Sequence, residues 1–403
     1  MQYKTLILTG LIGIGILIIG IGCEYDAPSS VYNPDSAGDK PEAVISQIVP
    51  EQEAGGGNEI VIHGENFASE LSDNAVYFNN VQAELVSGDT TQLVVLRPNL
   101  VEDSITIKVV VPGALNITEY SPYNILPVMK NFTKDFDGIK NVSGFAIGSE
   151  GNFYYYMGND RTLHKQDAGS TEKEAILDVS QRSVGRLRFG PGGDLFYTKK
   201  NILYVISFEE KIDSIYALLP ERTEFFDFDE NGYAYFVGDE LSMYIMKSPD
   251  EITTGDDYSE FECLALRIYN NAVYVLAEYT GDDEAIPVMA VWKNEIIENG
   301  VEVSEKELYV NWTDTEYGEA TPVDIEFGAD GALYISSDYE QPIIKVKDGL
   351  IYPLYINMLP SPVTLLDWGP DQYLYFYYDA DDADERHIYQ LDMGEMGAPH
   401  YGR

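Results

Sequence analysis

The sequence predicts an all-β protein in which a β-sandwich precedes a six-bladed β-propeller. The propeller is predicted by a phrase that recurs six times: an apolar strand, a tight polar turn, and a second strand rich in aromatic residues. Its turn residues are Gly151, Gly193, Gly232, Asn271, Gly331 and Gln372, separated by 42, 39, 39, 60 and 41 residues. A period near 40 with several strands per unit is typical of a propeller. The sandwich is predicted by short alternating strands that follow one another across residues 41–127.

The composition allows two or three domains and excludes some partners. The chain has 403 residues, with 25 basic and 68 acidic side chains, so its net charge is −43. Such a surface repels nucleic acid and a bare anionic membrane, and we expect neither as a partner. The same charge attracts cations, although adaptation to a saline habitat would explain it equally well.

The first 23 residues predict an export signal. Lys4 is followed by an uncharged apolar run from Leu6 to Ile21, which is short for a membrane span and suits a signal peptide. The run ends in small residues before Cys23, and residues 1–23 resemble a bacterial lipoprotein signal, although Gly20 stands where that pattern prefers Leu. The resemblance implies that Cys23 is lipidated. The alternative is an uncleaved N-terminal anchor, and either interpretation places the protein outside the cytoplasm, tethered to the envelope membrane.

Residues 24–40 are rich in Pro, Ser, Asp and Asn and predict a flexible linker. Glu24 and Asp26, next to Cys23, resemble the surface-export signals of Bacteroidetes-type lipoproteins. That resemblance implies a location at the outer membrane or the cell surface.

Residues 41–128 form the predicted sandwich. Ile60 and Ile62 alternate in a strand, and the phrase continues through Gly64 and Asn66 to Phe67. We expect Gly64 and Asn66 to form a turn with positive φ and Phe67 to fill the core. Pro50, Val76, Phe78 and Pro98 complete a pattern that resembles the IPT/TIG domain, an immunoglobulin-like fold. The resemblance implies a spacer or a contact module without catalytic residues.

Residues 129–393 form the predicted propeller, followed by a C-terminal tail at 394–403. The 31 tyrosines fit this architecture, because alternate residues of each strand fill the interfaces between blades. The repeats resemble NHL-type and gluconolactonase-like six-bladed propellers.

Charged residues on the inner strands are the main candidates for a site. Aligning the repeats on their turns places Ala146, Arg188, Asp227, Ala265, Glu326 and Asp367 at one equivalent position, with Arg186 and Asp324 two residues earlier in their strands. Unpaired buried charges are costly, so these groups are expected to converge at the channel. They form either a network of salt bridges that closes the ring or a ligand site.

Two further features are candidates. Asp227, Asp229 and Asn231 match the first half of a D-x-D-x-N-G calcium loop, but the distant glutamate is missing, so Ca²⁺ is a weak candidate and no other cofactor is expected. The long step of 60 residues predicts an insertion within 279–320, where exposed Trp312 and Tyr317 could stack on a sugar or a peptide. The alternative is that these aromatic residues belong to strands.

The sequence favours a binding function over catalysis. It contains no G-x-S-x-G motif, and no asparagine occupies the aligned inner positions where the gluconolactonase-like enzymes need amide ligands for a metal. We therefore expect a cell-envelope lipoprotein that binds a glycan, a peptide or an envelope protein. A metal-dependent hydrolase or lactonase and a structural adhesion component are the alternatives.

Overall fold

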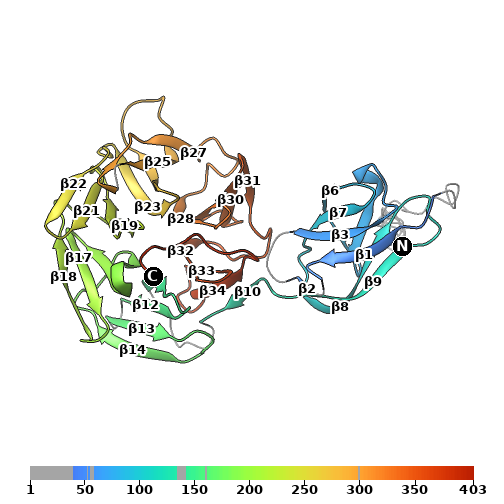
Figure 1. The fold of residues 1–403 in the computed structure, drawn as a ribbon, viewed down its shortest axis with the longest axis horizontal. Helices are drawn as coiled ribbons and strands as arrows, with labels where there is room; N and C mark the ends of the chain where they lie inside the picture. Colours follow the sequence, from blue (N-terminus) through green and yellow to red (C-terminus); the bar gives the residue numbers. More distant parts are fainter. Residues whose placement is uncertain (1–39, 52, 55–58, 134–141, 159–160, 298–299) are drawn as a thin grey trace, which may run out of the picture.

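The computed structural model describes residues 40–403 except 52, 55–58, 134–141, 159–160 and 298–299. It contains two β-domains, a sandwich and a ring of blades (Figure 1). The signal peptide, Cys23 and residues 24–39 of the linker lie outside the described residues. Within the described part of the chain, no helix is long and apolar enough to cross a membrane.

The first domain is a sandwich of two sheets. One sheet has the order β1 (Val44–Val49), β3 (Glu59–Glu65), β7 (Gln92–Leu96), β6 (Leu85–Gly88). The other has the order β2 (Glu53–Ala54), β9 (Thr118–Ile125), β8 (Glu102–Val110), β4 (Ala75–Phe78), β5 (Val81–Ala83). The apolar residues that alternate along these strands face one another and form a single core.

The Gly64–Phe67 phrase is explained by packing as much as by turn geometry. Asn66 has a φ of 61°, as expected, and Phe67 is buried in the sandwich core. Gly64 does not have positive φ; instead, a Cβ atom on it would lie 1.9 Å from the carbonyl oxygen of Val44. This glycine is therefore required because β1 passes close to its backbone.

The second domain is the predicted six-bladed propeller. Within the described residues, its sheets comprise β11 (Val142–Ile147), β12 (Phe153–Met157), β13 (Thr162–Gln166) and β14 (Lys173–Asp178); β15 (Leu187–Phe189), β16 (Leu195–Lys199), β17 (Ile202–Ser207) and β18 (Ile212–Leu218); β19 (Phe225–Phe228), β20 (Ala234–Val237), β21 (Tyr244–Ser248) and β22 (Glu251–Thr254); β23 (Phe261–Tyr269), β24 (Ala272–Tyr279), β25 (Met289–Ile297), β26 (Glu302–Val303) and β27 (Glu307–Asn311); β28 (Pro322–Phe327), β29 (Leu333–Ser337), β30 (Ile343–Lys347) and β31 (Leu350–Pro353); and β32 (Val363–Trp368), β33 (Tyr373–Tyr378), β34 (His387–Asp392) and β10 (Met129–Asn131). The first strand of each group is its inner strand, and these inner strands surround the ring centre (Figure 1).

The ring is closed by a strand from before the first blade. β10 pairs antiparallel with β34, with Met129 opposite Leu391, and supplies the outermost strand of the sixth blade. The start and the end of the propeller are thereby joined in one sheet.

The additional residues between the fourth and fifth turns form strands of blade four. β25 is nine residues long and pairs with both β26 and β27. The prediction that Trp312 and Tyr317 are exposed is wrong: both are buried, with exposed fractions of 0% and 4%. The indole nitrogen of Trp312 donates a hydrogen bond to the carbonyl of Ala320 at 2.9 Å, and both rings belong to the core between blades four and five.

Residues 394–403, expected to be a tail, enter the ring. The amide of Ala398 donates to the carbonyl of Phe327, and that of Ala329 donates to Met396, each at 2.9 Å, so the segment pairs with the end of β28. The C-terminus lies at the centre of the ring (Figure 1). We call residues 394–403 the C-terminal plug.

Candidate functional site

Four of the predicted inner-strand residues converge at the ring centre. Arg188, on β15, lies 3.2 Å from a carboxylate oxygen of Glu326 on β28 and 3.2 Å from one of Asp367 on β32. Asp227, on β19, lies 3.9 Å from the Nε of Arg188. All four side chains are buried. The sequence alignment therefore identified a buried ionic network.

Arg267 completes this network, and the sequence analysis missed it. Its Nε lies 2.8 Å from Glu326 and its Nη1 lies 2.7 Å from Asp227. Counting back from the turn residues places Ala265 at this position, but the hairpin of blade four is shorter, because Tyr269 pairs directly with Ala272. Arg267 lies opposite Tyr274, as Glu326 lies opposite Tyr334 in the next blade. The sequence did contain a signal: Arg267 directly precedes the last apolar residue before the turn, Ile268, as Arg188 directly precedes Phe189.

The aspartates also join neighbouring blades through the backbone. Asp227 accepts the amide hydrogen of Ile268 at 3.0 Å, Asp324 accepts that of Leu366 at 2.7 Å, and Asp367 accepts that of Ile147 at 3.0 Å. Each carboxylate thus links its inner strand to the inner strand of the next blade. Arg186, also predicted, forms an ion pair with Asp324 and donates to the carbonyl of Leu366 at 2.7 Å.

The C-terminal plug contributes to the same centre. Arg403 donates to the carbonyl of Ile147 at 2.8 Å, and Arg267 donates to the carbonyl of Pro399 at 2.9 Å. With Arg403 included, four arginines (186, 188, 267 and 403) face four carboxylates (227, 324, 326 and 367). The plug thus supplies the arginine that makes the numbers of positive and negative side chains in this network equal.

The environment shifts the pKa values of these groups. Burial raises the pKa of Asp367, and the nearby Arg188 only partly offsets this effect. Burial acts the same way on Glu326, but the Arg267 guanidinium outweighs it and holds the pKa of that carboxyl well below its usual range. Burial, together with Arg267 and Arg403, lowers the pKa of His400 well below its ordinary value, so its imidazole is neutral at physiological pH.

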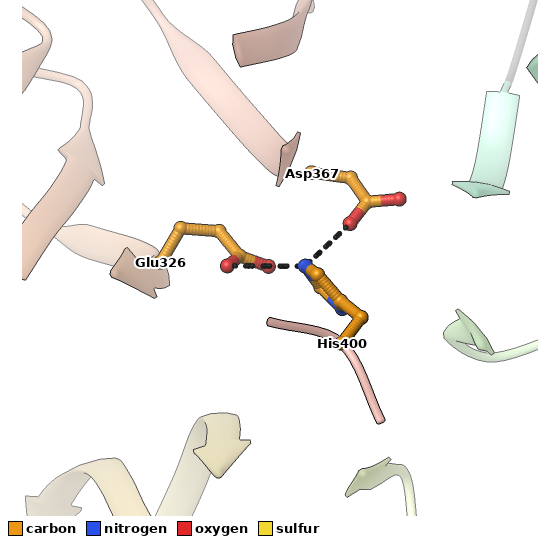
Figure 2. A group of neighbouring side chains, drawn as sticks. All are labelled: Glu326, Asp367 and His400. Atoms are coloured by element: carbon orange, nitrogen blue, oxygen red, sulfur yellow. Dashed lines mark ion pairs between the residues drawn. The ribbon is translucent and has the colours of Figure 1, made fainter. Parts of the chain in front are cut away.

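Glu326, Asp367 and His400 form the group that could hold a metal ion (Figure 2). The Nε2 of His400 lies 3.6 Å from Glu326 and 3.4 Å from Asp367 and has no hydrogen-bond partner among the described residues. The charges around it disfavour a divalent cation, because the four arginines already neutralise the four carboxylates. An ion would add two buried positive charges without compensation.

The predicted calcium loop does not converge on one point. Asp227 is bound by Arg267 and by backbone amides. Asp229 accepts the amide hydrogens of Asn231 at 2.9 Å and Tyr233 at 2.8 Å, which is the role of an aspartate that caps a tight turn. The spacing therefore reflects the hairpin turn of blade three.

A cavity of about 570 Å³ opens at the other end of the ring. It is lined by residues at or near the beginnings of all six inner strands: Ser143, Gly185, Phe225, Leu264, Pro322 and Thr364. The plug instead contacts the strand ends, at Ile147 and Phe327. The ring is therefore open at one mouth and closed at the other by its own chain. We call the open cavity the mouth cavity.

Comparisons with known proteins support the architecture. The IPT/TIG domain model matches residues 43–125, which span most of the sandwich. No curated protein sequence matches the chain.

Several solved structures are similar to this chain at low sequence identity. An auxiliary nutrient binding protein from Bacteroides thetaiotaomicron is 12% identical, with a TM-score of 0.51 over 87% of this chain and 98% of that one. A candidate gluconolactonase is 11% identical, with a TM-score of 0.50 over 68% and 94%. Regucalcin from Agrobacterium tumefaciens, described as a calcium-binding protein, is 12% identical, with a TM-score of 0.49 over 67% and 96%. The likeness to the first two of these proteins is one of fold.

Proposed function

We propose that this protein is an extracytoplasmic binding module and that the mouth cavity is its ligand site. The observation that carries the proposal is that all six blades contribute to one open cavity of about 570 Å³ on the ring axis. This volume lies within the range of small-molecule sites. A short glycan or an extended peptide segment, free or on an envelope protein, is the class of partner that fits it.

The ionic network supports a binding role because its groups already have protein partners. Arg188, Arg267 and the carboxylates around them hold neighbouring blades and the plug together. We therefore assign the charged inner-strand residues to ring closure. Ligand contact is assigned to the residues at the beginnings of the inner strands, which line the mouth cavity. The description of one protein of the same fold as an auxiliary nutrient binding protein agrees with this proposal.

Blocking the cavity tests the proposal. The protein is first screened against a glycan panel and against envelope proteins in a pull-down. The variant Thr364→Trp places a large ring in the mouth cavity, whereas Thr254→Trp makes the same change on β22, at the exposed outer edge of blade three. We expect the first variant to abolish binding and the second to retain it. Equal binding by both variants would remove the mouth cavity from consideration.

We also propose that Cys23 carries the lipid anchor and that the protein faces outward from the envelope. The support is the apolar run followed by small residues before Cys23. Metabolic labelling with a fatty acid, together with membrane fractionation, should give a labelled membrane-bound protein for the wild type and no label for Cys23→Ser. A labelled Cys23→Ser protein would contradict the assignment.

The alternative function is metal-dependent hydrolysis, which the Glu326, Asp367 and His400 group favours. In such a reaction a metal ion would supply Lewis-acid catalysis. Metal analysis of the purified protein distinguishes the two functions. We expect less than one tightly bound divalent ion per chain and unchanged ligand binding in His400→Asn. A stoichiometric ion lost in that variant would favour the hydrolase.

A further inference from the structure

The wall of the mouth cavity is basic in a protein that is otherwise strongly acidic. The chain contains 25 basic and 68 acidic residues. The cavity is lined by four of the basic residues (Arg186, Lys199, Lys200 and Arg222) but by one acidic residue, Glu224. The ratio of charges at this site is therefore the reverse of that in the whole chain.

The charges that face the cavity remain positive after pairing is taken into account. Arg186 is neutralised by its ion pair with Asp324. Glu224 pairs with Arg222 and therefore offsets one of the remaining three cations. Lys199 and Lys200 are left, and the hydrogen bond that Lys199 donates to the hydroxyl of Ser183 does not reduce its charge. The described cavity wall thus carries an excess of two positive charges.

These cations lie together on one side of the mouth. Lys199 ends β16 and Lys200 lies in the tight turn before β17, where its φ is 56°. Arg222 lies in the connection that leads to β19. Asp239 interacts electrostatically with Arg222 and Glu224 and offsets part of this local field. The effect of more distant acidic groups is screened, because the Debye length is about 8 Å at physiological ionic strength. A negatively charged group that enters the cavity is attracted mainly by the residues of its wall.

The rest of the wall is rich in hydroxyl groups. Ser143, Thr198, Thr223, Thr321 and Thr364 line the cavity. A hydroxyl can both donate and accept, so side chains such as Thr321 and Thr364 are complementary to a ligand that itself carries several hydroxyl groups.

From this combination we propose that the ligand is an acidic sugar, a short oligosaccharide that bears carboxylates. Lys199, Lys200 and Arg222 bind a carboxylate on one side of the cavity, and the hydroxyl side chains of Thr321 and Thr364, in blades five and six, bind the sugar hydroxyls. This inference rests on the proposed function, because it assigns the ligand class of the same mouth cavity.

The test compares two matched probes by calorimetry with the full chain: tetragalacturonate and a neutral galactose tetramer. We expect the acidic probe to bind more tightly, and its affinity to fall as NaCl is raised from about 50 to about 500 mM. Lys200→Gln and Arg222→Gln should each weaken the acidic probe by about three- to tenfold, as expected for partly exposed ionic contacts. Lys247→Gln removes the same charge from an exposed pair on β21 and should leave the affinity unchanged.

The possible results separate this inference from the proposed function. Equal binding of both probes, with no effect of Lys200→Gln or Arg222→Gln, overturns the acidic-sugar assignment, while sensitivity to Thr364→Trp would still support the mouth cavity. Preferential binding of a glutamate-rich peptide over both sugars also overturns the assignment. Binding of the acidic probe that Thr364→Trp leaves intact contradicts both proposals.

Discussion

Replacing Arg267 with methionine should destabilise the propeller strongly. Arg267 is fully buried and makes four hydrogen bonds: to Glu326 at 2.8 Å, to Asp227 and to the carbonyl of Ile268 at 2.7 Å each, and to the carbonyl of Pro399 at 2.9 Å. Methionine fills similar space but donates no hydrogen bond, so the buried network would keep four carboxylates and lose one of its four arginines. Removing one partner of a buried ion pair typically costs about 3–5 kcal/mol.

Tryptophan fluorescence during urea unfolding measures this loss. The chain has three tryptophans, all in the propeller at positions 292, 312 and 368, so the signal does not report on the sandwich. For a domain of this size the loss corresponds to a decrease in melting temperature of about 6–20 °C. Lys247→Met is the control, because its pair with Glu251 is exposed and should contribute less than about 0.5 kcal/mol.

A second substitution tests the electrostatic cause. Adding Glu326→Gln to Arg267→Met restores equal numbers of buried positive and negative groups. We expect the double variant to recover about 1–3 kcal/mol relative to the sum of the single changes. A loss below about 1 kcal/mol for Arg267→Met, or strictly additive effects, would refute the view that charge balance holds the ring centre together.

Two further predictions concern the C-terminal plug. A Cβ on Gly402 would lie 1.8 Å from the carbonyl oxygen of Phe189, so Gly402→Ala should cost about 1–3 kcal/mol of stability and lower the melting temperature. Gly148→Ala is the control, because its new methyl group would meet only ordinary contacts at 3.5 Å and should change the melting temperature little. Equal melting temperatures for the two variants would show that the plug does not contribute to stability. Burial and neighbouring arginines lower the pKa of His400 in the folded protein, so the unfolded chain binds the proton at higher pH than the folded protein does. This residue therefore lowers the free energy of unfolding as the pH falls below about 6.5. The decrease is up to about 1.4 kcal/mol per pH unit. His400→Asn should lack this component when urea unfolding is compared at pH 7.5 and 5.5, and parallel losses in both proteins would contradict the assignment.

Much of the fold could be predicted because the repeat is periodic. The turn residues Gly151, Gly193, Gly232, Asn271 and Gly331 all have positive φ, and each marks the first hairpin of a blade. Their spacing therefore identified the inner strands and most of their charged residues. Arg267 was missed because the hairpin after β23 is one residue shorter than that after β28, which shifts the count back from the turn.

The parts that could not be predicted depend on contacts between distant residues. His400 and Arg403 follow the last repeat in a segment without apolar periodicity, and their partners lie in other blades. The length of the fourth unit correctly marked an irregular blade, but length alone does not distinguish a protruding loop from longer strands. For that reason Trp312 was expected on the surface and lies in the core.

Closure of the ring through β10 has a consequence for how the protein folds. Met129 pairs with Leu391, which is synthesised 262 residues later, so blade six lacks its outer strand until nearly the whole propeller has formed. Contacts of such large sequence separation form slowly, and a sheet with an unpaired edge is prone to intermolecular association in the meantime. The pairing of β10 with β34 is therefore the step at which a nascent chain would be most exposed to aggregation and most dependent on a chaperone.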